Sequence, residues 1–318
     1  MISTLIPIPR IPVGDIFEGL FDWLNDNLGT AFDAISDVIG GVLDGFIAVL
    51  TGPDALVLAL VFALIALATR GWKFSILGFV GLLLVISMGQ WDAAMQTLAL
   101  VLVAALVAIL ISVPLGILAA RSRTASAIIR PILDFMQTMP GFVWLVPVVT
   151  LFGIGIVPGV VATIIFALPP GVRLTELGLR SVDSEVVEAS EAFGATPRQT
   201  LFGVQLPLAT PAIMAGVNQV IMMSLSMAVI AGLVGAGGLG GQVTSAIATL
   251  NIGLGFEAGL SVVILAIYLD RVTASFGAGT SISKAKFWRR SAAKRNAITS
   301  TEEADAAASV AKLEKVGG

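Results

Sequence analysis

The sequence predicts an all-α polytopic membrane protein. Of its 318 residues, 57% are hydrophobic and only 12% are charged, and the mean hydropathy is +0.98. A soluble domain carries about twice that share of charged residues. Apolar runs of the length needed to cross a bilayer as helices recur along the chain, with basic segments between several of them. These observations indicate the fold class before any motif is considered.

The composition excludes several classes of function. Cysteine and histidine are both absent, which excludes disulfides, thiol chemistry, histidine-based metal sites and histidine general bases. The net charge of −3 provides no basic footprint for nucleic acid. No phosphate-binding loop of the form G-x-x-x-x-G-K-[ST] occurs. We therefore expect no enzyme activity and no cofactor bound by this chain, and its energy source must be another subunit or an ion gradient.

Residues 1–54 are predicted to form an extracytoplasmic segment with one amphipathic helix. Over residues 15–46, acidic and apolar side chains both recur every three, four or seven positions, which is the period of a helix. Such a helix can lie at the membrane interface and brace the bundle or dock a partner. It can equally present a solvated acidic face with no partner. Gly29 and Gly40 mark positions where the helix could be interrupted.

About seven membrane spans are predicted, two of them in the N-terminal region 55–90 and five in a core over residues 91–272. Pro147 and Gly153 are expected to interrupt one core span, and Pro169-Pro170-Gly171 are expected to interrupt another. A break at membrane depth needs surrounding protein or water. The predicted boundaries are 55–69, 74–88, 94–120, 140–157, 160–179, 211–233 and 256–269.

Basic residues predict the orientation. The turn after the first span, the loop from Arg121 to Arg130, the segment 184–207 and the tail 273–318 all carry Lys or Arg, and the positive-inside rule puts them in the cytoplasm. Seven spans satisfy this with the N-terminus outside and the C-terminus inside. Glu176 lies at the predicted cytoplasmic end of its span, where a charge costs little, so it gives weak support for proton coupling.

The charged stretch 184–207 predicts a helical hairpin between two spans. Asp183 or the serine after it can cap the first helix, and Gly194 can end that helix with a positive φ. The Thr-Pro-Arg-Gln that begins at Thr196 combines a capping box with proline at the first helical position. Pro207 is expected to stop the second helix.

The spacing in this hairpin resembles the cytoplasmic coupling motif of ABC importer permeases. That motif reads Glu-Ala-Ala, three residues, Gly, nine residues, Ile, one residue, Leu-Pro. Here Glu188-Ala189-Ser190 is followed after three residues by Gly194 and then by Val204-Gln205-Leu206-Pro207, so Ser replaces Ala and Val replaces Ile. The alternative is a connecting hairpin whose Gly and Pro only punctuate helices. The resemblance implies docking of an ATP-binding subunit, with ATP and Mg, at Glu188, Ala189, Ser190, Ala192, Gly194, Ala195, Leu206 and Pro207.

Two further stretches resemble the permease subunit of glycine betaine/proline betaine importers. They are Pro131 to Pro140, continuing to Pro147, and the glycine-rich run Gly235 to Gly240. The likeness covers about residues 91–271. It implies the ABC importer permease fold in a bacterial or archaeal cytoplasmic membrane, with a second permease copy in a homodimer. Since no receptor domain follows the last span, it also implies a separate extracytoplasmic substrate-binding protein.

Aromatic residues are candidates for the substrate path, because a quaternary ammonium donates no hydrogen bond and is attracted to aromatic faces. The candidates are Phe135, Phe142, Trp144 and Phe166, each of which could instead be a packing or lipid-facing residue.

Other functions remain open from the sequence. The solute could be choline, carnitine or methionine. A gradient-driven secondary transporter would show inverted repeats with ion ligands in both halves, and no earlier partner of the hairpin is visible. A structural scaffold would leave the hairpin spacing unexplained.

Overall fold

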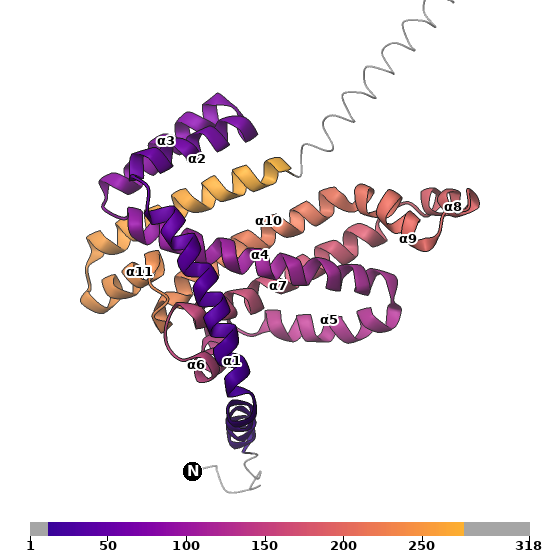
Figure 1. The fold of residues 1–318 in the computed structure, drawn as a ribbon, viewed down its shortest axis with the longest axis horizontal. Helices are drawn as coiled ribbons and strands as arrows, with labels where there is room; N and C mark the ends of the chain where they lie inside the picture. Colours follow the sequence, from indigo (N-terminus) through magenta and orange to yellow (C-terminus); the bar gives the residue numbers. More distant parts are fainter. Residues whose placement is uncertain (1–11, 277–318) are drawn as a thin grey trace, which may run out of the picture.

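The computed structural model describes residues 12–276, and these residues are helical apart from short turns, as predicted (Figure 1). The predicted tail 273–318 lies outside the described residues except for 273–276. The elements, in order, are α1 (Val13–Thr51), α2 (Ala55–Arg70), α3 (Trp72–Ser87), α4 (Trp91–Arg121), α5 (Arg123–Thr138), the 3₁₀ helix η1 (Gly141–Trp144), α6 (Leu145–Phe152), α7 (Ile156–Arg180), α8 (Ser184–Ala192), α9 (Pro197–Thr200), the π-helical turn η2 (Leu201–Gln205), α10 (Leu206–Ile230), the 3₁₀ helix η3 (Ala231–Val234), α11 (Gly238–Thr249) and a C-terminal helix, Ile252–Phe276.

The predicted number of spans, seven, is not confirmed. Five helices in the described part of the chain are long and apolar enough to cross a membrane, and a bent pair of helices could make a sixth. The helices α2 and α3 have 16 residues each, so each is only about 24 Å long, shorter than a hydrocarbon core of about 30 Å. The five are Gly14–Thr51, Trp91–Arg121, Ile156–Arg180, Pro197–Val234 and Ile252–Phe276.

The centre of the molecule is a bundle of α4, α7 and α10, which run side by side (Figure 1). Small residues bring these helices together. A Cβ atom added at Gly171 of α7 would lie 2.4 Å from the hydroxyl oxygen of Ser112 in α4. On the α10 side, a Cβ at Gly178 would lie 2.7 Å from Cβ of Ala212. Close approach through small residues is how membrane helices gain van der Waals contact, because lipid supplies no hydrophobic drive between them.

Pro169 and Pro170 do not interrupt α7, contrary to the prediction. The helix continues through both prolines to Arg180, and both are buried. The neighbouring Gly171 lies directly against Ser112 of α4. Protein therefore surrounds the two backbone positions that lack an N–H group, which is the condition under which a membrane helix tolerates proline.

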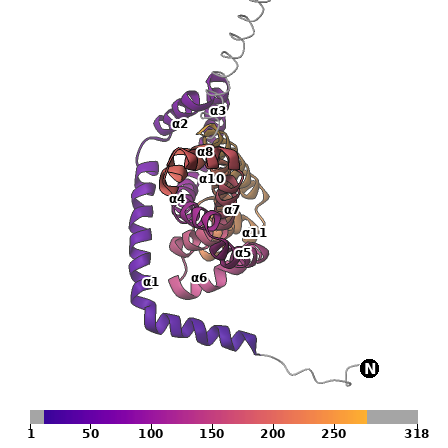
Figure 2. The ribbon, with the colours of Figure 1, turned by 90° about the vertical axis from the view of Figure 1, so that its right-hand side faces the viewer.

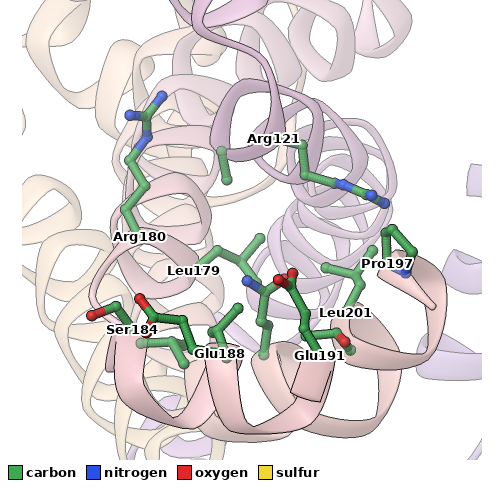
Figure 3. Close-up of a pocket in the computed structure, with 13 residues that line it drawn as sticks. Arg121, Leu179, Arg180, Ser184, Glu188, Glu191, Pro197 and Leu201 are labelled. Atoms are coloured by element: carbon green, nitrogen blue, oxygen red, sulfur yellow. The ribbon is translucent and has the colours of Figure 1, made fainter. Parts of the chain in front are cut away.

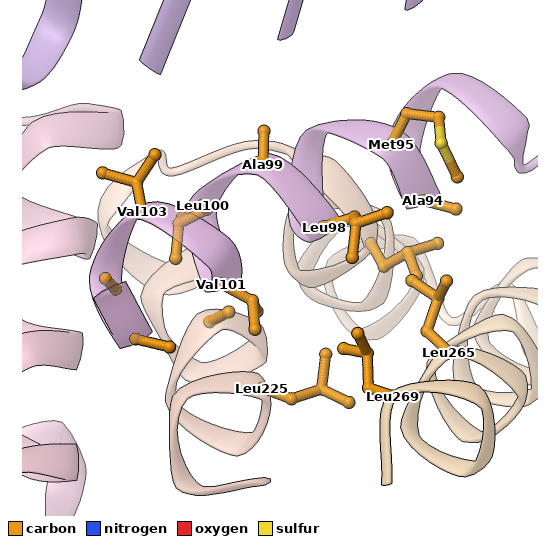
Figure 4. Packing of buried hydrophobic residues seen from close by; sticks show 14 of the residues in the cluster. Ala94, Met95, Leu98, Ala99, Leu100, Val101, Val103, Leu225, Leu265 and Leu269 are labelled. Carbon is orange, nitrogen blue, oxygen red and sulfur yellow. The ribbon is translucent and has the colours of Figure 1, made fainter. Parts of the chain in front are cut away.

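The helix α4 is buried on several sides and contributes many residues to the largest buried cluster. Leu98 and Val101 of α4 lie close to Leu225 of α10 and to Leu265 and Leu269 of the C-terminal helix (Figure 4). The cluster joins elements more than a hundred residues apart in the sequence, so it fixes the ends of the core against each other.

The helix α1 extends the predicted amphipathic segment to Thr51 as one helix, which is sharply bent into two arms (Figure 2). Leu43 is buried, and the rings of Phe32 and Phe152 meet edge to face at 5.4 Å between centroids. The helix is also long and apolar enough to cross a membrane. The sequence left open whether this helix braces the bundle, and its packing on α4 and α6 supports that role.

The segment after α4 differs most from the prediction. The predicted loop from Arg121 to Arg130 is almost entirely helical, because Arg121 ends α4 and α5 begins at Arg123, so only Ser122 separates the two helices. The predicted span 140–157 is not confirmed as one straight helix, because η1 and α6 together reach only Phe152 and lie at 105° to α5, with which they could form one broken span. We call the bend between α5 and α6, including η1, the elbow. Pro140 lies between α5 and η1 and has an extended backbone (ψ 136°). Because proline has no N–H to donate to a helical hydrogen bond, it is suited to this break between the two helices.

The glycine-rich run at η3 and α11 is a packing motif. The N–H groups of Gly238 and Leu239 donate to the side-chain oxygens of Gln96 (3.1 Å) and Thr97 (2.8 Å) on α4. The start of α11 therefore has its free donors bound by protein. A Cβ at Gly240 would lie only 2.6 Å from the carbonyl oxygen of Val229.

Gly240→Ala is therefore expected to destabilise the fold by about 1–3 kcal/mol, because the contact is with backbone, which cannot move aside. Gly241→Ala is the matched control, since nothing lies within 4 Å of a Cβ at that position. The apparent melting temperature of the two variants in detergent measures the difference. Equal melting of both would contradict this role for the glycine.

Candidate functional site

The first arm of the predicted hairpin, α8, is capped at both ends. The carboxylate of Asp183 accepts a hydrogen bond from the N–H of Glu185 at 2.9 Å. At the other end, the N–H groups of Gly194 and Ala195 donate to the carbonyls of Glu191 (2.8 Å) and Ser190 (3.2 Å). This is the Schellman pattern, and it requires the positive φ of Gly194, 81°. Both predicted caps of the arm are present.

The second arm begins as predicted but does not end at Pro207. Thr196 forms the reciprocal capping box with Gln199, whose side-chain oxygen accepts from the N–H of Thr196 at 2.8 Å. After α9 the chain passes through one π-helical turn, in which the N–H of Leu206 donates to the carbonyl of Leu201, five residues back. Pro207 then lies in the first turn of α10, where its missing N–H costs little.

The wider π turn is the physical reason that proline fails to stop the helix here. It changes the hydrogen-bonding register just before Pro207, so the helical course runs from Pro197 to Val234. The outer arm of the hairpin is therefore continuous with a membrane helix.

A side-chain contact joins the two arms. The hydroxyls of Ser190 in α8 and Thr200 in α9 are 3.1 Å apart, and Thr200 is buried. Ser190 is the residue that stands where the coupling motif has its second Ala. The sequence indicated only a small change there, whereas the structure uses the hydroxyl to hold one arm to the other.

A cavity of about 420 Å³ lies beneath the hairpin (Figure 3). Glu188 and Glu191 of α8 line it, together with Arg121 at the end of α4. Figure 3 shows Glu191 reaching toward the side of the cavity where Arg121 lies, whereas Arg180 turns away. Within residues 12–276, neither glutamate forms an ion pair. Both carboxylates are thus available to another molecule.

Phe193 at the tip of the hairpin is a residue that the sequence analysis missed. Its side chain is 93% exposed, although it is a large apolar group on a polar hairpin. It occupies the C-cap position of α8, next to Gly194. The signal was present in the sequence, because Phe193 is one of only two aromatic residues inside the charged stretch 184–207.

The other predicted coupling residues lie on the same structure. Ala189 and Ala192 are exposed on α8, and Ala195 lies in the turn. Leu206 is different, because it packs at the base of the hairpin with Leu179 and Leu201. The hairpin therefore collects the predicted residues of its first arm and turn, while Leu206 and Pro207 belong to the start of α10.

Three of the four predicted path aromatics meet at the elbow. The rings of Phe135 and Trp144 are 6.2 Å apart in an edge-to-face arrangement. Phe166 of α7 approaches Gly141 of η1, where an added Cβ would lie 3.2 Å from its ring. Phe142 is 58% exposed, and its ring forms none of the aromatic pairs found in the described residues.

A buried charged cluster ties the elbow to the bundle. Glu176 of α7 is only 3% exposed, and its carboxylate accepts hydrogen bonds from Ser126 (2.8 Å) and Arg130 (2.9 Å) of α5 and forms an ion pair with Arg180 (2.9 Å). Beside it, Arg173 of α7 pairs with Asp134 of α5. The sequence placed Glu176 at a helix end where charge costs little. The structure instead buries it as the link between α5 and α7.

Comparison with known proteins identifies the family. Residues 112–280 match the model described as "Binding-protein-dependent transport system inner membrane component". The chain belongs to this family. It is a membrane-spanning transport permease of the cytoplasmic membrane, a subunit that works with ATPase and substrate-binding partners and is not itself an enzyme.

Curated permeases resemble this one over most of its length. The permease is 47% identical to the glycine betaine transport system permease protein OpuAB of Bacillus subtilis, over 84% of this chain and 94% of the relative. It is 50% identical to the glycine betaine/proline betaine permease ProW of Escherichia coli, over 86% and 76%. It is 48% identical to the glycine betaine/carnitine permease GbuB of Listeria monocytogenes, over 85% and 96%.

A solved structure supports the fold. An inward-facing form of the MetNI methionine ABC transporter matches 58% of this permease and 92% of its own chain, with a TM-score of 0.52 and 25% identity. The predicted ABC importer permease fold is therefore confirmed, while the coupling and path residues remain predictions.

Proposed function

We propose that this permease moves glycine betaine or proline betaine across the membrane, driven by ATP hydrolysis in a separate subunit docked on the hairpin of α8 and α9. The observation that carries the proposal is the construction of that hairpin. Three of its helix ends are capped, its two arms are joined by the contact between Ser190 and Thr200, and its second arm is continuous with α10. The relatives that share about half of its sequence have names that contain glycine betaine.

Mechanical coupling needs a part that moves without deforming. Closing two ATPase subunits would displace the hairpin, and a rigid arm continuous with a membrane helix passes that displacement into the bundle. Glu188 and Glu191, free of ion pairs within the described residues, can accept hydrogen bonds from the ATPase surface. Gly194 and Ala195 present backbone with little side chain, which permits close approach.

The proposed orientation places the hairpin in the cytoplasm. Arg121, Arg180 and Arg198 lie at this end of the bundle, at the ends of α4 and α7 and in α9. Positive charge near span ends favours the cytoplasmic side. We propose a homodimer of this permease with two ATPase subunits and an external binding protein. Aromatic faces at Phe135, Trp144 and Phe166 would line the path near the elbow.

The test is ATP-driven uptake of radiolabelled glycine betaine into proteoliposomes that contain the permease, its ATPase and its binding protein. We expect uptake to require all three components and ATP, without a sodium or proton gradient. Uptake driven by a gradient in the absence of ATP would contradict the proposal. ATP-driven uptake of carnitine or choline in place of betaine would retain the coupling and reject the solute.

Two hairpin variants test the coupling residues. Gly194→Asp and Glu188→Arg lie outside the bundle core, so both should assemble in the membrane yet lose most ATP-driven uptake. Glu185→Arg is the control for the second variant, because it makes the same charge change on α8 outside the cavity. Normal uptake by both test variants would remove the coupling assignment.

A further inference from the structure

A second cavity, of about 580 Å³, lies between α1 and the elbow. This volume falls within the range of small-ligand pockets. Aromatic rings from three elements line it: Phe17 and Phe21 of α1, Phe135 of α5 and Trp144 of η1. In Figure 1, α6 and the adjoining part of α1 lie nearer to α11 than to the hairpin. The cavity is thus separate from the one that α8 covers.

Two of these rings are fixed in position. Phe135 and Trp144 pack edge to face with centroids 6.2 Å apart. The indole N–H of Trp144 donates to the carbonyl of Met136 at 3.3 Å. Because that N–H is already bound, the indole has only its ring to offer a ligand, and an aromatic ring attracts cations through its face.

Two carboxylates line the same cavity. Glu18 and Asp22 stand one helical turn apart on α1, alternating with Phe17 and Phe21. Neither acid forms an ion pair in the part of the chain that the structure describes, and the described lining residues include no Lys or Arg. The aromatic walls and the uncompensated acids are independent features, and both favour a cation that carries apolar surface.

We propose that this cavity binds a trimethylammonium group, an inference that rests on the proposed function because that group is the cationic end of the solute proposed above. The quaternary nitrogen of a trimethylammonium group carries no N–H and donates no hydrogen bond, so ring faces and carboxylates at van der Waals distance are the contacts available to it. The lining offers both within one cavity. Because the described lining residues include no Lys or Arg, nothing in the cavity pairs with the carboxylate of a betaine, and that carboxylate points to solvent.

This arrangement predicts an order of affinity. Tetramethylammonium and choline, which carry the cation without a carboxylate, bind at least as tightly as glycine betaine. The neutral isostere 3,3-dimethyl-1-butanol binds more weakly, since it keeps the shape and loses the charge. The group can belong to a free solute or to a choline lipid headgroup, and the lipid composition of the test separates the two.

The experiment is saturation-transfer NMR of tetramethylammonium with the full chain in nanodiscs of phosphatidylethanolamine and phosphatidylglycerol. The double variant Glu18→Gln/Asp22→Asn should weaken binding about tenfold, because it removes both charges and keeps their shape. Phe17→Leu/Phe21→Leu should weaken it by a similar factor while preserving apolar volume. The matched control is Asp33→Asn/Asp37→Asn, an acid pair with the same spacing on α1 outside the cavity.

Binding that depends on Glu18 and Asp22 and not on the control pair supports the site. If added phosphatidylcholine abolishes the signal, the headgroup is the preferred source of the same cation. Three results would overturn the site: no binding of tetramethylammonium, equal binding of the neutral isostere, or equal loss in the control pair. Wild-type betaine uptake with all partners, measured in the same lipids, is a separate readout. If uptake is driven by ATP but the cavity binds no cation, the proposed function stands and the site is rejected. If the cavity binds the cation but uptake is not driven by ATP, the proposed function is rejected.

Discussion

Replacing Phe193 by Asp should leave the permease folded but abolish most of its ATP-driven uptake. The side chain is 93% exposed at the tip of the hairpin, so the substitution removes almost no packing within the chain. A large apolar group held on a rigid turn is typical of an anchor that fills a pocket in a partner. Loss of such an anchor costs about 2 kcal/mol or more, which corresponds to roughly a thirtyfold loss of affinity for the ATPase.

Two measurements separate docking from folding. Co-purification of the ATPase with the variant should fall, while the melting temperature of the permease alone should not change. Phe193→Leu is the control, because it keeps an apolar side chain on the same turn and should retain most of the uptake. A Phe193→Asp permease that retains its ATPase and transports at the wild-type rate would show that the exposed ring has no partner.

Local sequence signals predicted the hairpin well. The caps of the hairpin are local, because each one joins groups only a few residues apart. The chemistry of Asp183, Gly194 and the capping box at Thr196 therefore decides the structure without help from the rest of the fold. The mistake at Pro207 has a physical origin. Proline signals a missing donor, but it does not reveal that a π turn ahead of it can change the register and keep the helix going.

Features that depend on contacts with the surrounding bundle were predicted less well. Pro169 and Pro170 looked like a break, yet protein packed around α7 keeps the helix continuous. Composition could not show that the chain turns by 105° at the elbow. The burial of Glu176 was also hidden, because its partners Ser126 and Arg130 lie about fifty positions away. Tertiary contacts, which a single sequence does not list, decide such features.

Glu176 should prove to be among the most costly residues to remove. Its carboxylate accepts hydrogen bonds from Ser126 and Arg130 and pairs with Arg180, and thereby holds α5 against α7. Glu176→Ala deletes all of these contacts at a buried position. Hydrogen bonds to charged groups contribute more than neutral ones, and a broken buried pair leaves charges uncompensated. Since Arg130 and Arg180 keep some access to solvent, we expect a loss of about 3 kcal/mol.

Glu176→Gln sharpens this test, because the amide keeps the size and one acceptor but not the charge. Its stability in lipid nanodiscs should fall between those of Glu176→Ala and wild type. Glu185→Gln, on the exposed side of α8, should melt like wild type. Because α5 carries the elbow, the Glu176 variants that still fold should also transport more slowly. If Glu176→Ala melted like Glu185→Gln, the contacts of Glu176 would contribute nothing to the fold, and the position of the elbow would have to be set by its other contacts, such as the Arg173–Asp134 pair and the buried side chains of Leu133 and Leu145.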